Sequence, residues 1–154
     1  MKKLTYLLLF GILGGMVFFG SCGGDDDDDG PNLTPQQEQA QALSGTWNQQ
    51  NTTQIPDGVD PTILNDLSIT FNIDANSNPT SFSASGADDF FITTSSSTWA
   101  FSGSSTTAIV LSNVSPVTSL TINSVSDSQL SVTFTSAGGR VTGLDGTYTV
   151  ELTK

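Results

Sequence analysis

The sequence predicts an all-β fold, a small antiparallel up-and-down β-barrel of about eight strands preceded by a short helix. A β-sandwich is the alternative. From residue 45 to the C-terminus, hydrophobic residues alternate with polar ones, which is typical of strands with one buried and one solvated face. Segments rich in Gly, Pro, Asn, Asp and Ser separate these strands at hairpin lengths, so we expect a sheet closed on itself or two packed sheets.

The alternation is clearest in residues 67–73, 130–135 and 147–153. Weaker strands are expected around Trp47, Phe82, Trp99 with Phe101, Ile109 with Leu111, and Leu120 with Ile122. An eight-stranded barrel is just wide enough to be filled by side chains or to hold one small ligand. Large aromatic side chains that we expect inside it favour a filled interior: Trp47, Phe71, Phe82, Trp99, Phe101, Phe134 and Tyr148.

A helix start precedes the first strand. Thr34 is a capping residue, Pro35 suits the first helical position, and Gln37 completes the spacing of a capping box. We expect a helix that runs to Leu43 and is ended by Gly45. Residues 35–154 are therefore predicted to form the folded domain.

The first 21 residues read as a signal peptide. Lys2 and Lys3 precede an apolar stretch from Leu4 to Phe19, and small residues follow it. A retained membrane anchor is the alternative, although an apolar stretch of this length with three glycines is marginal for crossing a ~30 Å hydrocarbon core.

The end of this segment, Phe19-Gly20-Ser21-Cys22, resembles the lipobox of bacterial lipoproteins, with Phe19 in place of the usual aliphatic residue. The resemblance implies that Cys22, the only cysteine, is diacylated on sulfur and acylated on its new amino terminus, which attaches the chain to a membrane.

Residues 22–34 form an acidic linker. Its first part resembles the tether that follows the lipidated cysteine in surface-displayed lipoproteins of some Gram-negative bacteria. That resemblance implies an export signal and a lipid-anchored position on the outer membrane, facing the cell exterior. A solvated spacer, with the protein on the periplasmic face, is the alternative. The tether residues are Gly23, Gly24, Asp25, Asp26, Asp27, Asp28 and Asp29.

Three motifs of the folded region resemble small bacterial lipocalin-like lipoproteins. They are Leu43-Ser44-Gly45-Thr46-Trp47, Trp99-Ala100-Phe101, and the ending Gly146-Thr147-Tyr148 to Leu152-Thr153-Lys154. The resemblance implies that Trp47 plugs one end of the barrel and that a late arginine stacks on it. Arg140, the one arginine in the chain, is the candidate; its alternative is an exposed loop residue paired with carboxylates.

Composition excludes several functions. The formal charge of −11 repels phosphate backbones, so we expect no nucleic-acid partner. The chain has no histidine, and lipidation would consume its cysteine, so His-based nucleophile pairs, zinc sites and disulfides are excluded. Asp88-Asp89 could form a general acid–base pair, but adjacent residues on a strand point to opposite faces and do not converge, so we interpret the two aspartates as part of a solvated loop. Residues 74–78 copy the start of a calcium loop but continue with Pro79, so we interpret them as a turn.

These observations predict a protein that is not an enzyme and carries no cofactor or metal. We expect a lipid-anchored barrel that serves as a scaffold or interaction module, with a surface protein or a glycan as its partner. The alternative function is the binding of a small apolar ligand in the barrel lumen.

Overall fold

The computed structural model describes residues 32–138 and 141–154. They begin with helix α1 (Pro35–Leu43), whose start is the predicted capping box. The backbone N–H of Gln37 donates to Thr34 Oγ1 at 3.3 Å, and the N–H of Thr34 donates to Gln37 Oε1 at 2.9 Å. The helix buries Ala40 and Leu43 on one face, and Ser44, rather than the expected Gly45, is its C-cap. The predicted helix is therefore confirmed.

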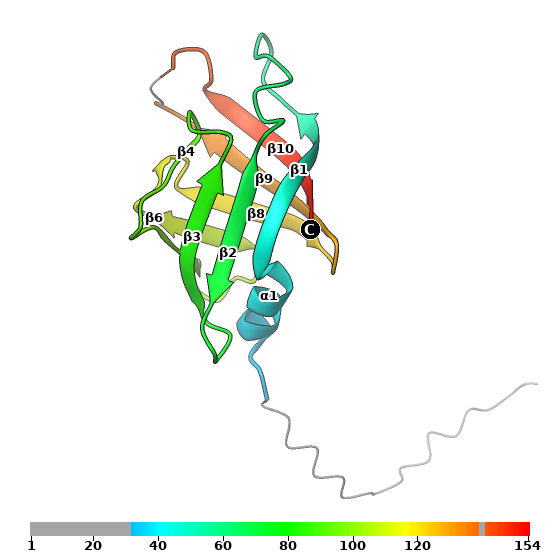
Figure 1. The fold of residues 1–154 in the computed structure, drawn as a ribbon, viewed down its shortest axis with the longest axis vertical. Helices are drawn as coiled ribbons and strands as arrows, with labels where there is room; N and C mark the ends of the chain where they lie inside the picture. Colours follow the sequence, from blue (N-terminus) through cyan, green and yellow to red (C-terminus); the bar gives the residue numbers. More distant parts are fainter. Residues whose placement is uncertain (1–31, 139–140) are drawn as a thin grey trace, which may run out of the picture. The chain divides into compact units, whose positions relative to one another are not determined.

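The strands form a closed antiparallel barrel in the order β1-β10-β9-β8-β6-β5-β3-β2 (Figure 1). Its members are β1 (Gly45–Gln54), β2 (Ser68–Ile73), β3 (Pro79–Ser85), β5 (Thr98–Phe101), β6 (Ala108–Ser112), β8 (Ser119–Val125), β9 (Gln129–Ser136) and β10 (Gly146–Thr153). Each strand pairs with the next barrel strand along the chain, and β1 closes the ring by pairing with both β2 and β10. The predicted eight-stranded barrel is confirmed, and the β-sandwich is not formed.

Period-two burial explains why these segments are strands. Tyr148, Val150 and Leu152 of β10 are buried, whereas Glu151 between them is exposed. The neighbouring strand β9 follows the same alternation, and its eight residues pair in continuous register with β10, from Ser136↔Gly146 to Gln129↔Thr153. Because both strands present one apolar face to the lumen, a slip of one residue would expose that whole face.

Two further strands were not predicted from the sequence. β4 (Phe91–Ile92) and β7 (Ser115–Pro116) pair with each other outside the barrel sheet, with Phe91 opposite Pro116. β4 lies in the connection between β3 and β5, and β7 in that between β6 and β8. Two-residue strands have no readable alternation, so only the folded chain reveals them.

The barrel has two different ends (Figure 1). The helix end carries α1 and the turns at residues 74–78, 102–107 and 126–128. The loop end carries the longer connections at residues 55–67, 86–97, 113–118 and 137–145, of which 139–140 are not described. Within residues 32–138 and 141–154, no helix has the length and hydrophobicity needed to cross a membrane.

Candidate functional site

Most of the site residues expected from the sequence lie outside the described residues. This applies to the lipidation residue Cys22, to the tether from Gly23 to Asp29, and to Arg140. Trp47 is the expected site residue that the structure places, together with the barrel interior that it helps to close.

Trp47, the third residue of β1, is fully buried at the helix end of the barrel. Its indole Nε1 donates a 2.7 Å hydrogen bond to the carbonyl oxygen of Leu43. Since Leu43 is the last helical residue, this bond ties the end of α1 to the start of β1. The polar atom of the buried ring is thereby satisfied, as a large interior aromatic requires.

The cation that covers Trp47 is Lys154. Its Nζ lies 4.4 Å from the centroid of the indole ring and donates to the carbonyl oxygen of Ala42 at 3.3 Å. The residue predicted for this role was Arg140, which lies outside the described residues. The sequence feature that could have predicted this contact is the place of Lys154 at the end of the closing motif, directly after the strand that pairs with β1.

Aromatic side chains fill the lumen as one connected cluster. Successive ring centroids lie 4.8 to 6.3 Å apart, mostly edge to face, which is the favourable geometry for aromatic pairs. In order of contact the cluster contains Phe101, Trp99, Phe71, Phe82, Phe91, Phe134, Tyr148 and Phe90. All of the aromatic residues expected in the interior are buried except Phe101, which is half-buried.

Phe90 and Phe91 were missing from the expected interior. They follow the exposed carboxylates Asp88 and Asp89, yet Phe90 and Phe91 are at most 1% exposed. A tight turn produces this reversal, because the N–H groups of both phenylalanines donate to the carbonyl oxygen of Ala87. The loop that was expected to be solvated therefore exposes Asp88 and Asp89 to solvent, whereas Phe90 and Phe91 point inward at the loop end of the barrel.

The polar atoms of the buried aromatic rings are already paired. Trp99 Nε1 donates to the carbonyl oxygen of Asn72, and the Tyr148 hydroxyl donates to that of Leu144, both at 2.8 Å. Burial, with a smaller contribution from the charge of Asp145, raises the pKa of Tyr148, so its hydroxyl stays protonated as a donor. Among the described residues, Ser136 Oγ is the buried side-chain oxygen without a hydrogen-bond partner. Ligand pockets orient their ligands with convergent polar groups. In this barrel the polar atoms of Trp99 and Tyr148 are bonded to backbone carbonyl oxygens of the chain itself.

The carboxylate of Asp74 is likewise hydrogen-bonded within its own turn. Asp74 accepts hydrogen bonds from the backbone of Asn76 and from the backbone and side chain of Asn78. The side-chain bond from Asn78, followed by its backbone bond, lowers the pKa of Asp74. Residues 74–78 therefore form a turn, as expected. Within residues 32–138 and 141–154, no group of three or more His, Cys, Asp or Glu residues is arranged to hold a metal ion.

Comparison with known proteins gives no assignment. No protein-family model, curated protein or solved structure matches the chain. Inferences about function therefore depend on the geometry and on the sequence motifs themselves.

Proposed function

We propose that this chain is a lipid-anchored, surface-exposed bacterial lipoprotein whose non-catalytic barrel serves as a scaffold or interaction module. One observation favours an interaction module over a carrier of a small apolar ligand. A connected aromatic cluster fills the lumen, with α1 and Trp47 at one end and Phe90 and Phe91 at the other. A barrel of this kind offers its outer wall and its loops to a partner rather than its interior.

The lipid anchor is proposed from residues 1–22. A basic start, an apolar stretch and Gly20-Ser21 precede Cys22, in the order that a lipoprotein signal requires. Several acyl chains on Cys22, each stabilised by ~0.8 kcal/mol per buried CH2, would give lasting attachment to the membrane. The folded domain needs no membrane contact of its own for this arrangement.

Metabolic labelling tests the anchor. We expect labelled palmitate to be incorporated into the wild-type chain and not into Cys22→Ala, which should also keep its signal segment. Ser21→Ala is the matched control, because it keeps a small residue before the cysteine. Palmitate incorporated into Cys22→Ala would refute the lipid anchor.

The acidic linker is proposed to separate the barrel from the membrane and to direct it to the outer surface. The residues between Cys22 and Thr34 span at most ~40 Å when fully extended. Replacement of Asp25 to Asp29 with asparagine tests the export role. We expect the variant to become resistant to external protease in intact cells. Unchanged cleavage would show that the aspartates act only as a spacer.

The competing function is the binding of a small apolar ligand in the lumen. It requires the aromatic cluster to open, because rings of β2, β3, β5, β9 and β10 now contact one another there. Xenon binding in the lumen of the wild-type barrel would distinguish a ligand carrier from an interaction module.

A further inference from the structure

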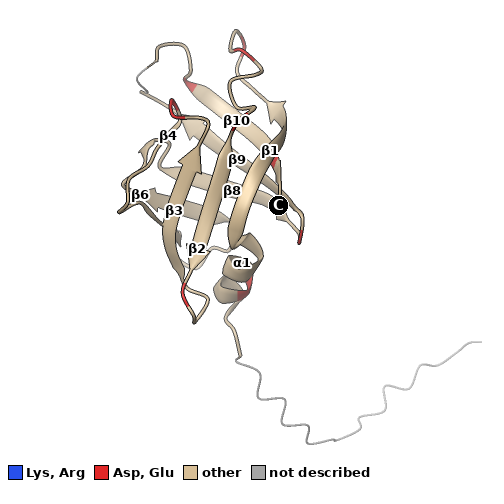
Figure 2. Ribbon diagram, in the orientation of Figure 1, with Lys and Arg blue, Asp and Glu red and all other residues tan. Residues whose placement is uncertain are grey.

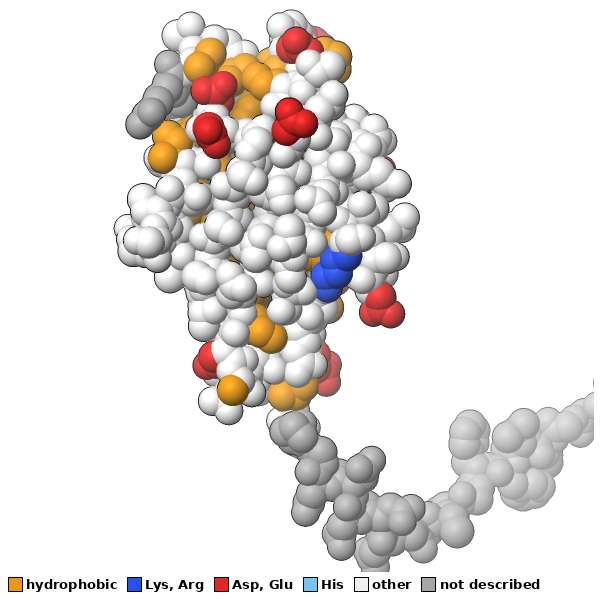
Figure 3. Space-filling view, in the orientation of Figure 1, with side chains coloured by type: hydrophobic (Ala, Val, Ile, Leu, Met, Phe, Trp, Pro, Cys, Tyr) orange, Lys and Arg blue, Asp and Glu red, His pale blue; other side chains and the backbone are white. Residues whose placement is uncertain are grey.

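The outer wall of the barrel carries a single charge. The ten strands that the structure describes contain one charged residue, Glu151 of β10, whose side chain is exposed. The other acidic residues of the described chain lie in α1 or in the loops and turns (Figure 2). Most of the wall in Figure 3 accordingly consists of uncharged polar side chains and backbone. A lone carboxylate on such a surface is a specific feature and not part of a charged face.

Two β-bulges lie on either side of Glu151. In the β1–β10 pair the register shifts between Gln49 and Asn51, so Gln50 is an extra residue opposite β10. In the β8–β9 pair it shifts between Ile122 and Ser124, so Asn123 is extra. Bulges bend a strand and re-aim its side chains, and they recur beside functional sites. Both bulges flank the central β9–β10 pair at the level where Ser131 opposes Glu151.

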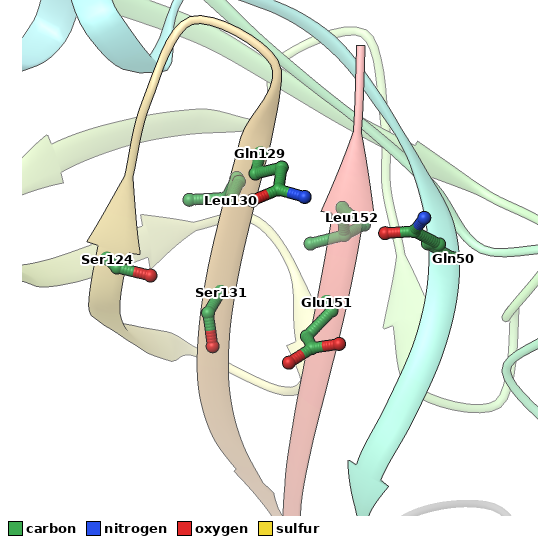
Figure 4. A pocket seen from close by; sticks show the side chains of 7 residues that line it. All are labelled: Gln50, Ser124, Gln129, Leu130, Ser131, Glu151 and Leu152. Atoms are coloured by element: carbon green, nitrogen blue, oxygen red, sulfur yellow. The ribbon is translucent and has the colours of Figure 1, made fainter.

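The bent strands enclose a small cleft of about 120 Å³ (Figure 4). Its lining residues come from four adjacent strands: Gln50, Ser124, Gln129, Leu130, Ser131, Glu151 and Leu152. Leu130 and Leu152 are buried in the core, whereas the side chains of Gln50, Gln129 and Glu151 are exposed. In Figure 4 Gln50 and Gln129 extend toward each other from opposite sides of β10. The short side chains of Ser124 and Ser131 leave room between these longer ones.

The negative charge of the cleft is available to a ligand. Glu151 Oε2 accepts one hydrogen bond, from Asn51 Nδ2 at 3.3 Å. The described cation nearest in sequence, Lys154, directs its Nζ to Trp47 and the carbonyl oxygen of Ala42 instead. A carboxylate accepts up to four hydrogen bonds, and the amide oxygens of Gln50 and Gln129 add further acceptors.

We propose that this cleft binds the side chain of an arginine presented by a partner protein. The planar guanidinium pairs with a carboxylate through two parallel hydrogen bonds, and its remaining N–H groups match amide and hydroxyl oxygens. The cleft is too small for a drug-sized ligand, whose sites measure roughly 300–1,000 Å³, but it suits one side chain. Arginine anchors in such pockets are enriched among the residues that dominate interfaces. The inference rests on the proposed role as an interaction module.

An NMR titration of the full-length chain in detergent tests the proposal. The probe is an acetylated, amidated Gly-Arg-Gly peptide, added at physiological ionic strength. We expect saturable shifts of the backbone amides of Gln50, Ser131 and Glu151, with a dissociation constant on the order of 1 mM. Glu151→Gln should weaken binding about tenfold or more, because a charge-assisted pair becomes a neutral one. Glu38→Gln, which removes an exposed carboxylate of α1, should leave binding unchanged.

A second probe keeps the test independent of any variant's folding. The same peptide with citrulline, a neutral isostere of arginine, should produce no saturable shift on the wild-type chain. Equal binding of the two peptides, equal binding by Glu151→Gln, or preferential binding of methyl glucoside at the same amides would overturn the proposal. Each of these results would leave the lipid anchor and the filled lumen intact, since palmitate labelling and cavity measurements test those separately.

Discussion

Both ends of the barrel bury aromatic side chains, but the helix end combines local with distant contacts, whereas the loop end depends on distant contacts. At the helix end, Thr34 caps α1 three residues from Gln37, and Trp47 bonds to Leu43 four residues away. Distant contacts then dock the helix on the turns. Gln36 donates to the carbonyl oxygens of Gly103 and Ser105, Gln37 to that of Asn76 and Gln41 to the hydroxyl of Ser77, while Lys154 covers Trp47.

At the loop end, closure depends on distant contacts. Phe91 pairs with Pro116 through β4 and β7, and the N–H of Val117 donates to the carbonyl oxygen of Phe90. Gly86, at φ +75°, lies against the backbone of Asp66, where any Cβ would collide with the Asp66 carbonyl. The cap of α1 and the Trp47–Leu43 bond are therefore encoded locally, whereas the docking of α1 on the turns and the closure of the loop end both form only when the barrel is assembled.

Removal of the buried Trp47 ring at the helix end should have the largest effect. Trp47→Ala is expected to lower the free energy of unfolding by ~3–5 kcal/mol, from lost burial and the cavity left behind. A domain of this size has ~5–15 kcal/mol in total. Denaturant unfolding should show a much lower midpoint with an unchanged slope.

The matched control for Trp47→Ala is Thr70→Ala. Thr70 lies on the outer face of β2 and shares a 2.9 Å hydroxyl–hydroxyl hydrogen bond with Thr46. Its loss should cost only ~1 kcal/mol. If the two variants unfolded at the same midpoint, Trp47 would not be the structural plug of the helix end.

At the loop end, Phe91→Ala should cost somewhat less, ~3 kcal/mol, because the connection that carries Phe91 can relax into part of the cavity. Phe91 contacts Phe82 and Phe134, with ring centroids 6.3 and 5.0 Å apart. The control is Asp89→Ala on the exposed side of the same turn, which should change the unfolding midpoint little. Equal stability of the two variants would mean that Phe91 does not close this end.

The helix cap gives the smallest expected effect. Thr34→Ala removes the side-chain acceptor of the capping box and should cost ~1 kcal/mol. Because α1 covers the helix end, hydrogen exchange should quicken in α1 and leave β4 and β7 unchanged. Faster exchange at both ends would show that the two ends are coupled and that the cap does not act on the helix end alone.

The same contrast explains which features the sequence could predict. The barrel strands follow from period-two alternation, and α1 follows from the capping box, since both patterns are contained in neighbouring residues. Phe90 and Phe91 could not be placed, because two adjacent aspartates mark a loop and the turn at Ala87 is not visible in the sequence. The cleft at Glu151 depends on two bulges. Each bulge shifts the inward–outward alternation by one residue, as between Ile122 and Val125, and such a break in a polar segment reads like the end of a strand. The contact of Lys154 with Trp47 was not predicted either, because it depends on where the end of β10 lies relative to β1 in the folded barrel.

The filled lumen is tested by crystals pressurised with xenon, which enters apolar cavities such as an engineered one of about 150 Å³. The proposed function predicts no xenon inside the wild-type barrel. Phe91→Ala crystals serve as the positive control, because the cavity left by the ring should admit xenon between Phe82 and Phe134. Xenon bound among Phe71, Trp99 and Phe134 of the wild-type protein would contradict the filled barrel and would favour a ligand carrier instead.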